Sequence, residues 1–233
     1  MAPTIILIRH AQALHIQNYQ LHDPELTELG FGPQCDELAK HLQNDLPLAQ
    51  EIELIVVSPM KRTLQTAQQS LGWLMTRGVP VMLRAEWQEN SDSPCDTGSS
   101  IEVMEKEWPQ FDWSAVDPLF PAKSGLYEFS KAALIKRGIT AKQWLKDRPE
   151  KVIAVVSHSA FLRTVVSNRR YENADYRIFT FAEDDTTLIE SEITDKRGGG
   201  LGKSPKGIFL MEAGDYRPEK EKDLGEATRE LPN

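Results

Sequence analysis

The sequence predicts an α/β protein, a three-layer sandwich in which helices cover both faces of a mostly parallel central sheet that carries one inserted cap segment. Two observations support this: three continuous apolar runs have the length of strands, and helical patterns follow them along the chain. Runs that are apolar at every position are typical of strands covered on both faces. Strands that alternate with helices in this way favour parallel pairing.

Each of the three apolar runs stops abruptly at polar residues. Because the runs are rich in β-branched residues, we expect strands that deliver polar side chains at their carboxyl ends. The runs, each with the residues that follow it, are Pro3–Ile8 with Arg9-His10, Glu53–Val57 with Ser58-Pro59, and Lys151–Val156 with Ser157-His158.

Helical patterns lie between and after these strands. In the second of them, Leu64 and Leu71 share one face with apolar neighbours. In the third, we expect an interruption near Gly138, where Thr140 would cap a second helix. The expected helices are one capped by Thr27, then Lys61–Met75, Ser124–Lys146 and Ser159–Ser167.

The remaining segments have weaker patterns. Val79–Leu83 is expected to be a further strand. Asn90–Lys123 has little periodicity, which predicts a long loop or a small cap. Thr187–Ile193 and Lys206–Met211 are expected to be a closing strand pair joined by a turn at Arg197–Gly202.

The domain organisation follows from this order of elements. A chain of 233 residues is long enough for one sizeable domain with a full core. We expect a single domain over residues 1–211, with the cap at about 90–123. Residues 212–233 form a charged tail with few apolar residues, which predicts a segment that wraps the surface or is disordered.

Composition narrows the classes of function. With 27 Lys and Arg against 35 Asp and Glu, the net charge is −8, which argues against a nucleic-acid partner. No apolar run reaches the roughly 18 residues of a membrane span. Two cysteines, Cys35 and Cys95, lack the spacing of metal ligands, and no secretory leader precedes the first strand. We therefore expect a cytoplasmic protein with free thiols; the sequence does not address its oligomeric state.

The strand ends suggest the site. Ligands of open α/β sheets bind at the carboxyl ends of the strands. Arg9, His10, Arg62 and His158 all follow such ends, so we expect two imidazoles and two guanidiniums to converge in one pocket. A single Arg-His pair would be weak support for a site, but three separated segments strengthen it.

That set of side chains suits a phosphoryl group. A guanidinium matches phosphate oxygens with two parallel N–H donors and stays charged. A neutral imidazole attacks phosphorus and forms a covalent phosphoenzyme that water hydrolyses. Two arginines, a protonated second histidine and helix N-termini would stabilise the charge of the transferring group. The residues therefore predict phosphoryl transfer without a metal or a cofactor.

Several separated motifs occur in a specific order. They are Leu7–Gln12, Asp23–Gly30 with Gln34-Cys35, Ser58–Ala67, Gln88-Glu89 with Pro94–Gly98, and Val156–His158. From about Thr4 to Leu162 these motifs resemble the histidine phosphatase superfamily, with its phosphoglycerate-mutase-like fold, and within it the fungal small-phosphatase-like branch. The resemblance implies a phosphomonoester hydrolase that acts on a small metabolite through a phosphohistidine.

The resemblance also implies roles for single residues. By position, His10 matches the nucleophile, and Arg9 and Arg62 match the arginines that bind phosphate. His158 matches the second catalytic histidine. Further candidates for contacting the bound group are Gln12, His15 and Ser159.

A carboxylic acid is expected to protonate the leaving oxygen. Glu89 occupies the place of that acid in the family, and Glu86 and Asp96 are nearby alternatives. To serve as a general acid the carboxyl must be protonated, so the site must raise its pKa by burial or by neighbouring negative charge.

The chain departs from the family pattern at three places. Ile16 stands where the family often has an asparagine that binds phosphate, Ser159-Ala160 replaces a common glycine after the second histidine, and the segment from Asn90 onward does not align with a characterised mutase. Two alternatives therefore stay open. One is acid/base chemistry on an acidic metabolite without phosphate, and the other is a catalytically idle domain that binds phosphorylated ligands.

Overall fold

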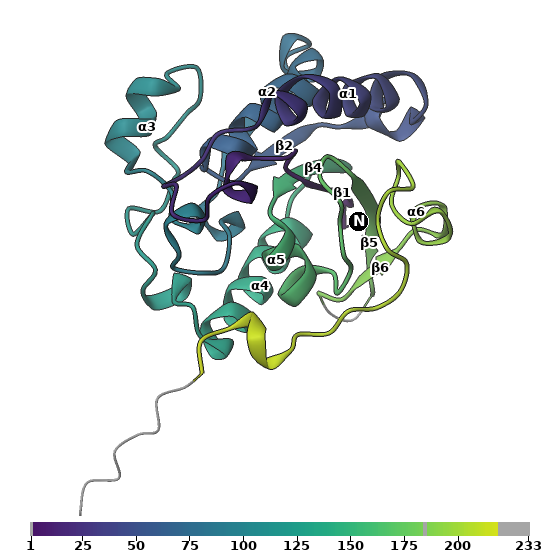
Figure 1. Ribbon diagram of the computed structural model, residues 1–233. Helices are drawn as coiled ribbons and strands as arrows, with labels where there is room; N and C mark the ends of the chain where they lie inside the picture. Colours follow the sequence, from purple (N-terminus) through teal and green to yellow (C-terminus); the bar gives the residue numbers. More distant parts are fainter. Residues whose placement is uncertain (1, 184–185, 219–233) are drawn as a thin grey trace, which may run out of the picture.

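The computed structural model describes residues 2–183 and 186–218. Its centre is a six-stranded sheet with the strand order β3-β2-β4-β1-β5-β6 (Figure 1). β1, β4, β2 and β3 pair in parallel, whereas β5 is antiparallel to β1, and β6 to β5. The mostly parallel sheet is thus confirmed. The strands are β1 Thr4–Arg9, β2 Leu54–Val57, β3 Val81–Leu83, β4 Val152–Ser157, β5 Tyr176–Phe181 and β6 Leu188–Glu190.

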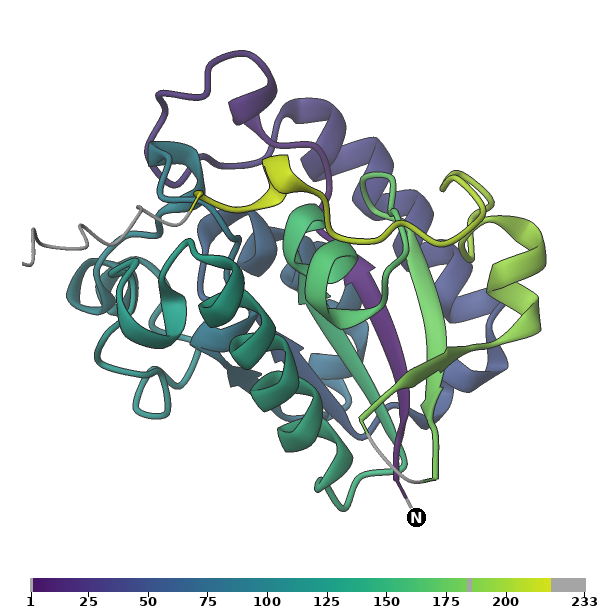
Figure 2. The ribbon, with the colours of Figure 1, turned by 90° about the horizontal axis from the view of Figure 1, so that it is seen from below.

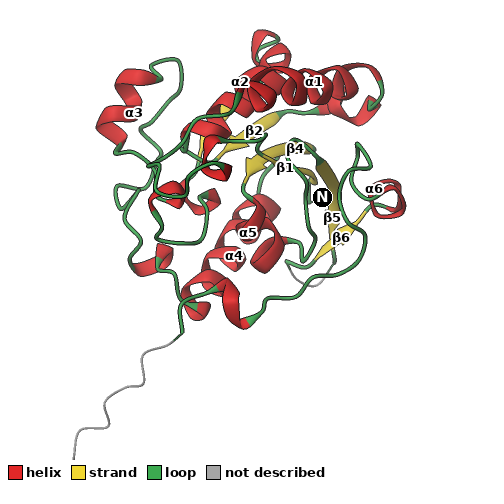
Figure 3. Ribbon diagram, in the orientation of Figure 1, coloured by secondary structure: helices red, strands yellow, loops and turns green. Residues whose placement is uncertain are grey.

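Helices lie on both sides of the sheet, which gives the expected three layers (Figure 3). α1 and α2 cover one face, and α4 and α5 cover the other. The α-helices are α1 Cys35–Asn44, α2 Lys61–Thr76, α3 Ile101–Glu107, α4 Lys131–Lys146, α5 Ser159–Phe161 and α6 Glu192–Arg197. The π turns are Gly30–Gln34 before α1 and Leu162–Val166 after α5. The 3-10 turns are Leu14–Ile16, Pro47–Glu51, Ala85–Trp87, Pro94–Asp96, Gly125–Tyr127 and Ala213–Asp215.

The central strand β1 shows why the apolar runs are continuous. Ile6 and Ile8 belong to the core beneath α1 and α2, and Ile5 and Leu7 to the core beneath α4 and α5. Successive side chains of a strand point to opposite faces, so a strand between two helical layers needs apolar residues at every position.

Of two expectations about helices, the cap at Thr27 is confirmed and the interruption near Gly138 is wrong. Thr27 accepts a hydrogen bond from the amide of Gly30 at 3.1 Å, as the expected cap does. The interruption near Gly138 was a wrong prediction, because α4 runs through Gly138 and Thr140 without a break. A Cβ atom at Gly138 would lie 2.7 Å from the Val165 backbone oxygen, so this glycine allows two segments to pack closely.

The predicted closing strand pair was half wrong. Leu188–Glu190 is a strand, but it pairs with β5, which the sequence did not suggest. Lys206–Met211 is not a strand; within it, Ile208 and Leu210 are 67% and 66% exposed. β5 was missed because the charged Arg177 stands within it, and the structure buries that charge against Glu190 of β6 at 2.7 Å.

The predicted turn at Arg197–Gly202 follows α6 and folds onto Asp175. The Asp175 carboxylate accepts hydrogen bonds from the amides of Leu201 and Lys203 at 2.9 and 3.3 Å and from the Ser204 hydroxyl at 2.6 Å. Gly199 has a φ of +81°, and a Cβ there would lie 2.1 Å from an Asp175 oxygen. These contacts end the turn at a buried carboxylate, so no strand follows.

The segment after β3 is a packed cap. It contains a 3-10 turn at Pro94–Asp96 and the helix α3. Met104, Phe111 and Trp113 are buried in the same core as α1 and α2. Apolar residues without regular spacing therefore anchor this cap to the domain.

The last described residues cross the surface. The C-terminal segment, yellow in Figure 2, runs from the region of α6 toward the cap. Asp215 pairs with Arg163, and Arg217 pairs with Asp92 in the loop after β3. Of the tail expected at residues 212–233, the part from residue 219 onward lies outside the described residues, and the domain boundary at 211 stays a prediction. None of the helices in the described ranges is both long and apolar enough to cross a membrane.

Candidate active site

Three neighbouring parallel strands deliver the candidate site. β2, β4 and β1 are adjacent in the sheet, so their carboxyl ends meet at one edge. His10 follows β1, His158 follows β4, and Arg62 lies in the first turn of α2 after β2. The ring centres of His10 and His158 are 5.2 Å apart. The structure therefore brings His10, His158 and Arg62 together, as expected.

The protonation of His10 follows from its contacts. Its Nδ1 lies 2.7 Å from the carbonyl oxygen of Ala11, and since a carbonyl only accepts, Nδ1 carries the proton. The other nitrogen, Nε2, accepts a hydrogen bond from Arg62 Nε at 3.2 Å. Burial, and then the charges of Arg62 and Arg9, hold the pKa of His10 well below its ordinary value. His10 is thus a neutral imidazole with a lone pair on Nε2.

Arg62 joins the histidines to the cap. Besides contacting His10, its Nη1 donates to the carbonyl oxygen of Cys95 at 2.7 Å, and its Nη2 lies 3.4 Å from Asp96 Oδ1. Its side chain is 1% exposed. The guanidinium is therefore fixed with its charge directed at His10. We call the two histidines and two arginines, His10, His158, Arg62 and Arg9, the floor of the site.

Arg9 is the second cation of the site. Its Nη1 donates to the carbonyl oxygen of Tyr171 at 2.7 Å, and its buried Nε has no partner among the described residues. Burial lowers its pKa, which the carboxylates of Glu172 and Glu89 oppose. A partly buried guanidinium with an unused donor is suited to bind an anion.

His158 is buried next to His10. Its Nε2 is 2.9 Å from the Ser58 hydroxyl, and its Nδ1 has no partner in the described part of the chain. Burial, and then Arg62 and His10, hold its pKa well below the ordinary value. The imidazole expected to be protonated is therefore neutral while the site holds no anion.

Glu89 is held by backbone amides. Its Oε1 accepts from Asn90 at 2.9 Å and from Phe161 at 3.0 Å, and its Oε2 accepts from Ala160 at 3.2 Å. Burial, and then the charge of Asp96, raise its pKa, which Arg62 and these amides oppose. The environment therefore favours the protonated carboxyl that a general acid requires.

The two alternative carboxylates are placed differently. Asp96 lies at Arg62 and accepts a hydrogen bond from the Ser91 hydroxyl at 2.6 Å. Glu86 forms its ion pair with Arg84 instead. Asp96 thus contacts the Arg62 guanidinium, whose charge also acts on Glu89, whereas Glu86 is paired elsewhere.

The three further candidate ligands, Gln12, His15 and Ser159, lie at the margin of the floor. Oε1 of Gln12 accepts from the Thr27 hydroxyl at 3.0 Å. The His15 ring is 5.8 Å from that of His10, and burial, and then Arg62, lower the pKa of His15 to about 4. Ser159 begins α5, directly after His158. Their roles as ligands stay predictions.

Two charged residues near Glu89 were missed from the sequence. Lys123, at the end of the cap, donates from Nζ to the carbonyl oxygen of Glu89 at 2.7 Å, and burial, and then Arg137, lower its pKa to about 7. Arg137 is fully buried on α4. Its place among the buried Leu134 and Ala141 could have indicated it, because a charge on the apolar face of a helix is unusual. Nothing in the sequence around Lys123 is comparable.

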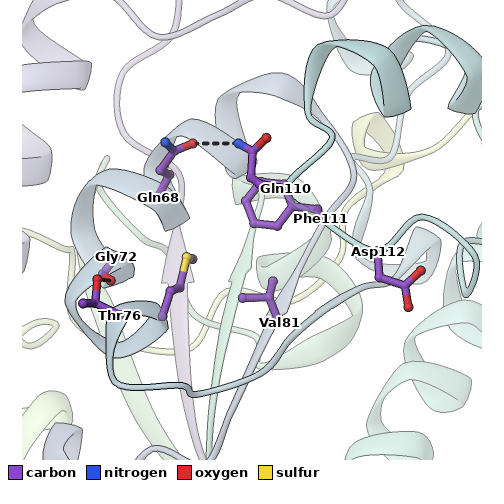
Figure 4. A pocket seen from close by; sticks show the side chains of 8 residues that line it. Gln68, Gly72, Thr76, Val81, Gln110, Phe111 and Asp112 are labelled. Carbon is purple, nitrogen blue, oxygen red and sulfur yellow. Dashed lines mark hydrogen bonds between the residues drawn. The ribbon is translucent and has the colours of Figure 1, made fainter.

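Other features of the molecule do not belong to this chemistry. Cys35 and Cys95 are both buried and free, and burial raises their pKa to about 11. A groove of about 570 Å³ lies between α2, β3 and the cap, where Gln110 donates to Gln68 at 3.3 Å (Figure 4). None of the described residues that line this groove is a histidine or an arginine. Within residues 2–183 and 186–218, no group of three His, Cys, Asp or Glu side chains is arranged to hold a metal ion.

Comparisons with known proteins agree with this geometry. The chain is 33% identical over 168 residues to a "probable phosphatase" of Schizosaccharomyces pombe, covering 69% of this chain and 76% of that protein. It is 30% identical over 261 residues to phosphoglycerate mutase-like protein 1 of Arabidopsis thaliana, covering 89% of each. The alpha-ribazole phosphatase of Shigella flexneri shares the fold at 17% identity, with a TM-score of 0.54 over 81% of this chain and 94% of that chain.

The family assignment rests on most of the chain. The model of the histidine phosphatase superfamily (branch 1) matches residues 5–199, a span that includes both site histidines and both site arginines. The resemblance of the motifs is thereby confirmed, and a fungal phosphatase is among the relatives. The chain belongs to the histidine phosphatase superfamily, and it is an enzyme of the phosphatase type.

Proposed function

We propose that this chain hydrolyses phosphomonoesters of a small metabolite without a metal ion, through a phosphorylated His10. The observation that carries the proposal is the hydrogen bond from Nδ1 of His10 to the Ala11 carbonyl oxygen at 2.7 Å. This bond fixes the proton on Nδ1 and leaves the Nε2 lone pair beside the Arg62 guanidinium. A nucleophile and a phosphate ligand are then directed at the same space.

The first step transfers the phosphoryl group. Nε2 of His10 forms the bond to phosphorus as the bond from phosphorus to the ester oxygen breaks. The Glu89 carboxyl gives its proton to that oxygen, which leaves as an alcohol. Arg9 and Arg62 balance the charge on the equatorial oxygens, the task that a metal ion has in other phosphoryl-transfer sites.

The second step releases phosphate. The Glu89 carboxylate takes a proton from water as the water oxygen attacks phosphorus, and the bond to His10 Nε2 breaks. Inorganic phosphate leaves, and both residues return to their starting protonation. Because the incoming phosphoryl group is an anion, it opposes the effect of Arg62 on the pKa of His158 and favours the protonated form of that histidine.

A small phosphorylated metabolite is the substrate class that these residues support. The guanidinium and imidazole groups of the floor provide enough hydrogen-bond donors for one phosphoryl group. Beside them the cap places Asp96 at Arg62 and Lys123 at the carbonyl oxygen of Glu89. The two buried, unpaired cysteines support the cytoplasm as the proposed location, since disulfides are rare there.

Phosphate release and intact-protein mass test the proposal. Wild type and His10→Ala are mixed with p-nitrophenyl phosphate and a panel of metabolite phosphates, with a metal chelator present. We expect turnover by wild type, a mass gain of one phosphoryl group, and at least a roughly 10³-fold loss in the variant. His22→Ala, which removes an exposed histidine, is the matched control and should stay active.

The alternatives predict different results. Full activity of His10→Ala, or loss of wild-type turnover with chelator, would contradict the proposal. Tight phosphate binding without turnover would indicate an idle binding domain. Hydrolysis of no phosphomonoester and no mass gain would favour chemistry on an acidic metabolite without phosphate.

A further inference from the structure

Arg137 is a buried charge whose cost the fold does not explain. Its side chain is 0% exposed, and it forms no ion pair with a carboxylate of the described residues. Nη2 donates to Asn90 Oδ1 at 2.6 Å, while Nε and Nη1 have no partner in the described ranges. The guanidinium carbon lies 4.3 Å from the centre of the Phe161 ring. An apolar side chain of similar size would fill this place at a lower cost in free energy.

The partner of Arg137 is directly connected to the proton donor. The backbone amide of Asn90 donates to Glu89 Oε1 at 2.9 Å, so both ends of Asn90 are engaged. Its side-chain amide donates from Nδ2 to the Thr164 hydroxyl at 3.1 Å. Asn90 thus links α4, the turn after α5 and the carboxyl of Glu89.

The same turn holds Glu89 from the other side. The Thr164 hydroxyl donates to the carbonyl oxygen of Ala160 at 2.8 Å, and the amides of Ala160 and Phe161 donate to the Glu89 carboxyl. The contacts form a closed cycle that runs from Glu89 through Asn90 and Thr164 to the first turn of α5 and back. Arg137 contacts this cycle at two residues. It donates its one hydrogen bond within the described residues to Asn90, and its guanidinium lies over the aromatic face of Phe161.

The charge of Arg137 also acts on Glu89. Burial lowers the pKa of Arg137 to about 10, so it is a cation at neutral pH, and the charge of Glu89 is the next influence on it. A neighbouring cation favours the ionised carboxyl, which opposes the effect of burial. The other charged groups that act on Glu89 or contact its backbone are Asp96, Arg62, Arg9 and Lys123.

We propose that Arg137 is a positioning residue that, through Asn90 and the first turn of α5, holds the Glu89 carboxyl in place for proton transfer to the leaving group. The inference rests on the proposed function, because it requires ester cleavage in which Glu89 donates a proton. Arg137 itself touches no reacting atom. Its removal therefore affects the step that needs the proton and spares the binding of phosphate by Arg9 and Arg62.

Leaving groups separate this role from a purely structural one. p-Nitrophenolate leaves without protonation, whereas the alkoxide of glycerol 3-phosphate needs a proton. For Arg137→Met we expect kcat on glycerol 3-phosphate to fall roughly 10-fold or more, while kcat on p-nitrophenyl phosphate stays within about 2-fold. KM for both esters should be unchanged, and Arg137→Lys should recover part of the loss.

The pH profile gives a second readout. Removal of the cation raises the pKa of Glu89, so the fall of kcat at alkaline pH should move to higher pH in Arg137→Met. Asn90→Ala keeps the guanidinium but breaks its link to Glu89, and it should reproduce the dependence on the leaving group if Arg137→Met fails to fold. Arg77→Met removes an exposed arginine and is the matched control.

The outcomes distinguish the two proposals. If wild type hydrolyses both esters and each variant loses activity equally on both, or if the alkaline limb does not move in Arg137→Met, the positioning role of Arg137 is wrong and the phosphatase function stands. If wild type hydrolyses no phosphomonoester of the panel, the proposed function fails, and the inference about Arg137 fails with it.

Discussion

The floor of the site and its carboxylate wall differ in construction but share one physical cause. The floor consists of His10 and His158, each placed directly after a parallel strand, together with Arg9 and Arg62. The wall consists of Asp96 and of Glu89, which three backbone amides hold in irregular backbone. Burial is the first cause of the pKa shift in the two histidines and in Glu89, and it acts in opposite directions. It lowers the pKa of an imidazole and raises that of a carboxyl, because it disfavours the charged form of each.

The same loss of solvent therefore supports both proposed roles, that of His10 as nucleophile and that of Glu89 as proton donor. A neutral imidazole is a nucleophile, and a neutral carboxyl is a proton donor. Enzymes that work through paired groups commonly need environments that push the pKa values of the two in opposite directions. Here one buried site does so because the groups differ in charge type.

The largest expected effect separates the two carboxylates of the wall. Glu89→Gln keeps an oxygen for the amides but cannot donate an acidic proton, so we expect kcat on glycerol 3-phosphate to fall roughly 10² to 10⁴-fold. Asp96→Asn should cost less, since the Asp96 carboxylate contacts Arg62, Ser91 and Cys95 and acts on Glu89 through its charge alone. Steady-state kinetics of both variants check this. A larger loss in Asp96→Asn would make Asp96 the proton donor.

The next effect concerns pH. His10 must be neutral to attack, and because its pKa is depressed, kcat should persist on the acid side of the ordinary histidine value. Glu89 must be protonated to donate, so kcat should fall as pH rises through its raised pKa. The profile of kcat on glycerol 3-phosphate measures both limbs. An alkaline limb that stays unchanged in Glu89→Gln would assign it to another group.

The smallest effect is expected at the margin of the floor. The His15 ring is 5.8 Å from that of His10, and with its pKa lowered to about 4 it is neutral near pH 7. His15→Asn should therefore raise KM by roughly 5-fold, the value of one ordinary hydrogen bond, and leave kcat within about 2-fold. A large fall in kcat would place His15 among the catalytic residues.

The floor could be predicted from the sequence because regular structure places it. Parallel strands buried on both faces are continuous apolar runs, and the residues that end them must meet at one edge. That reasoning places Arg9, His10 and His158 without any knowledge of the rest of the chain. The edge strand β5 was missed because its charged Arg177 is balanced by Glu190, a partner known only from the fold.

The wall was only partly predictable. Glu89 could be named as one of three candidate acids. The sequence does not show that Asp96 contacts Arg62 in the site while Glu86 pairs with Arg84 instead, so it could not separate the candidates. Arg137 contacts Asn90, and Lys123 contacts the Glu89 carbonyl oxygen, although the two residues lie 48 and 34 positions from Glu89 in the chain. No local pattern encodes such contacts, because they result from how α4 and the cap pack on the sheet.

The close packing at Gly138 limits how this protein can change. A Cβ atom there would lie 2.7 Å from the Val165 backbone oxygen, and Val165 is next to Thr164 in the cycle of contacts around Glu89. Replacing a glycine within a helix by alanine commonly adds up to about 1 kcal/mol of stability. At this position the substitution would push the turn that carries Thr164 away from α4. The close contact with Val165 therefore removes from α4 a substitution that would strengthen a helix elsewhere.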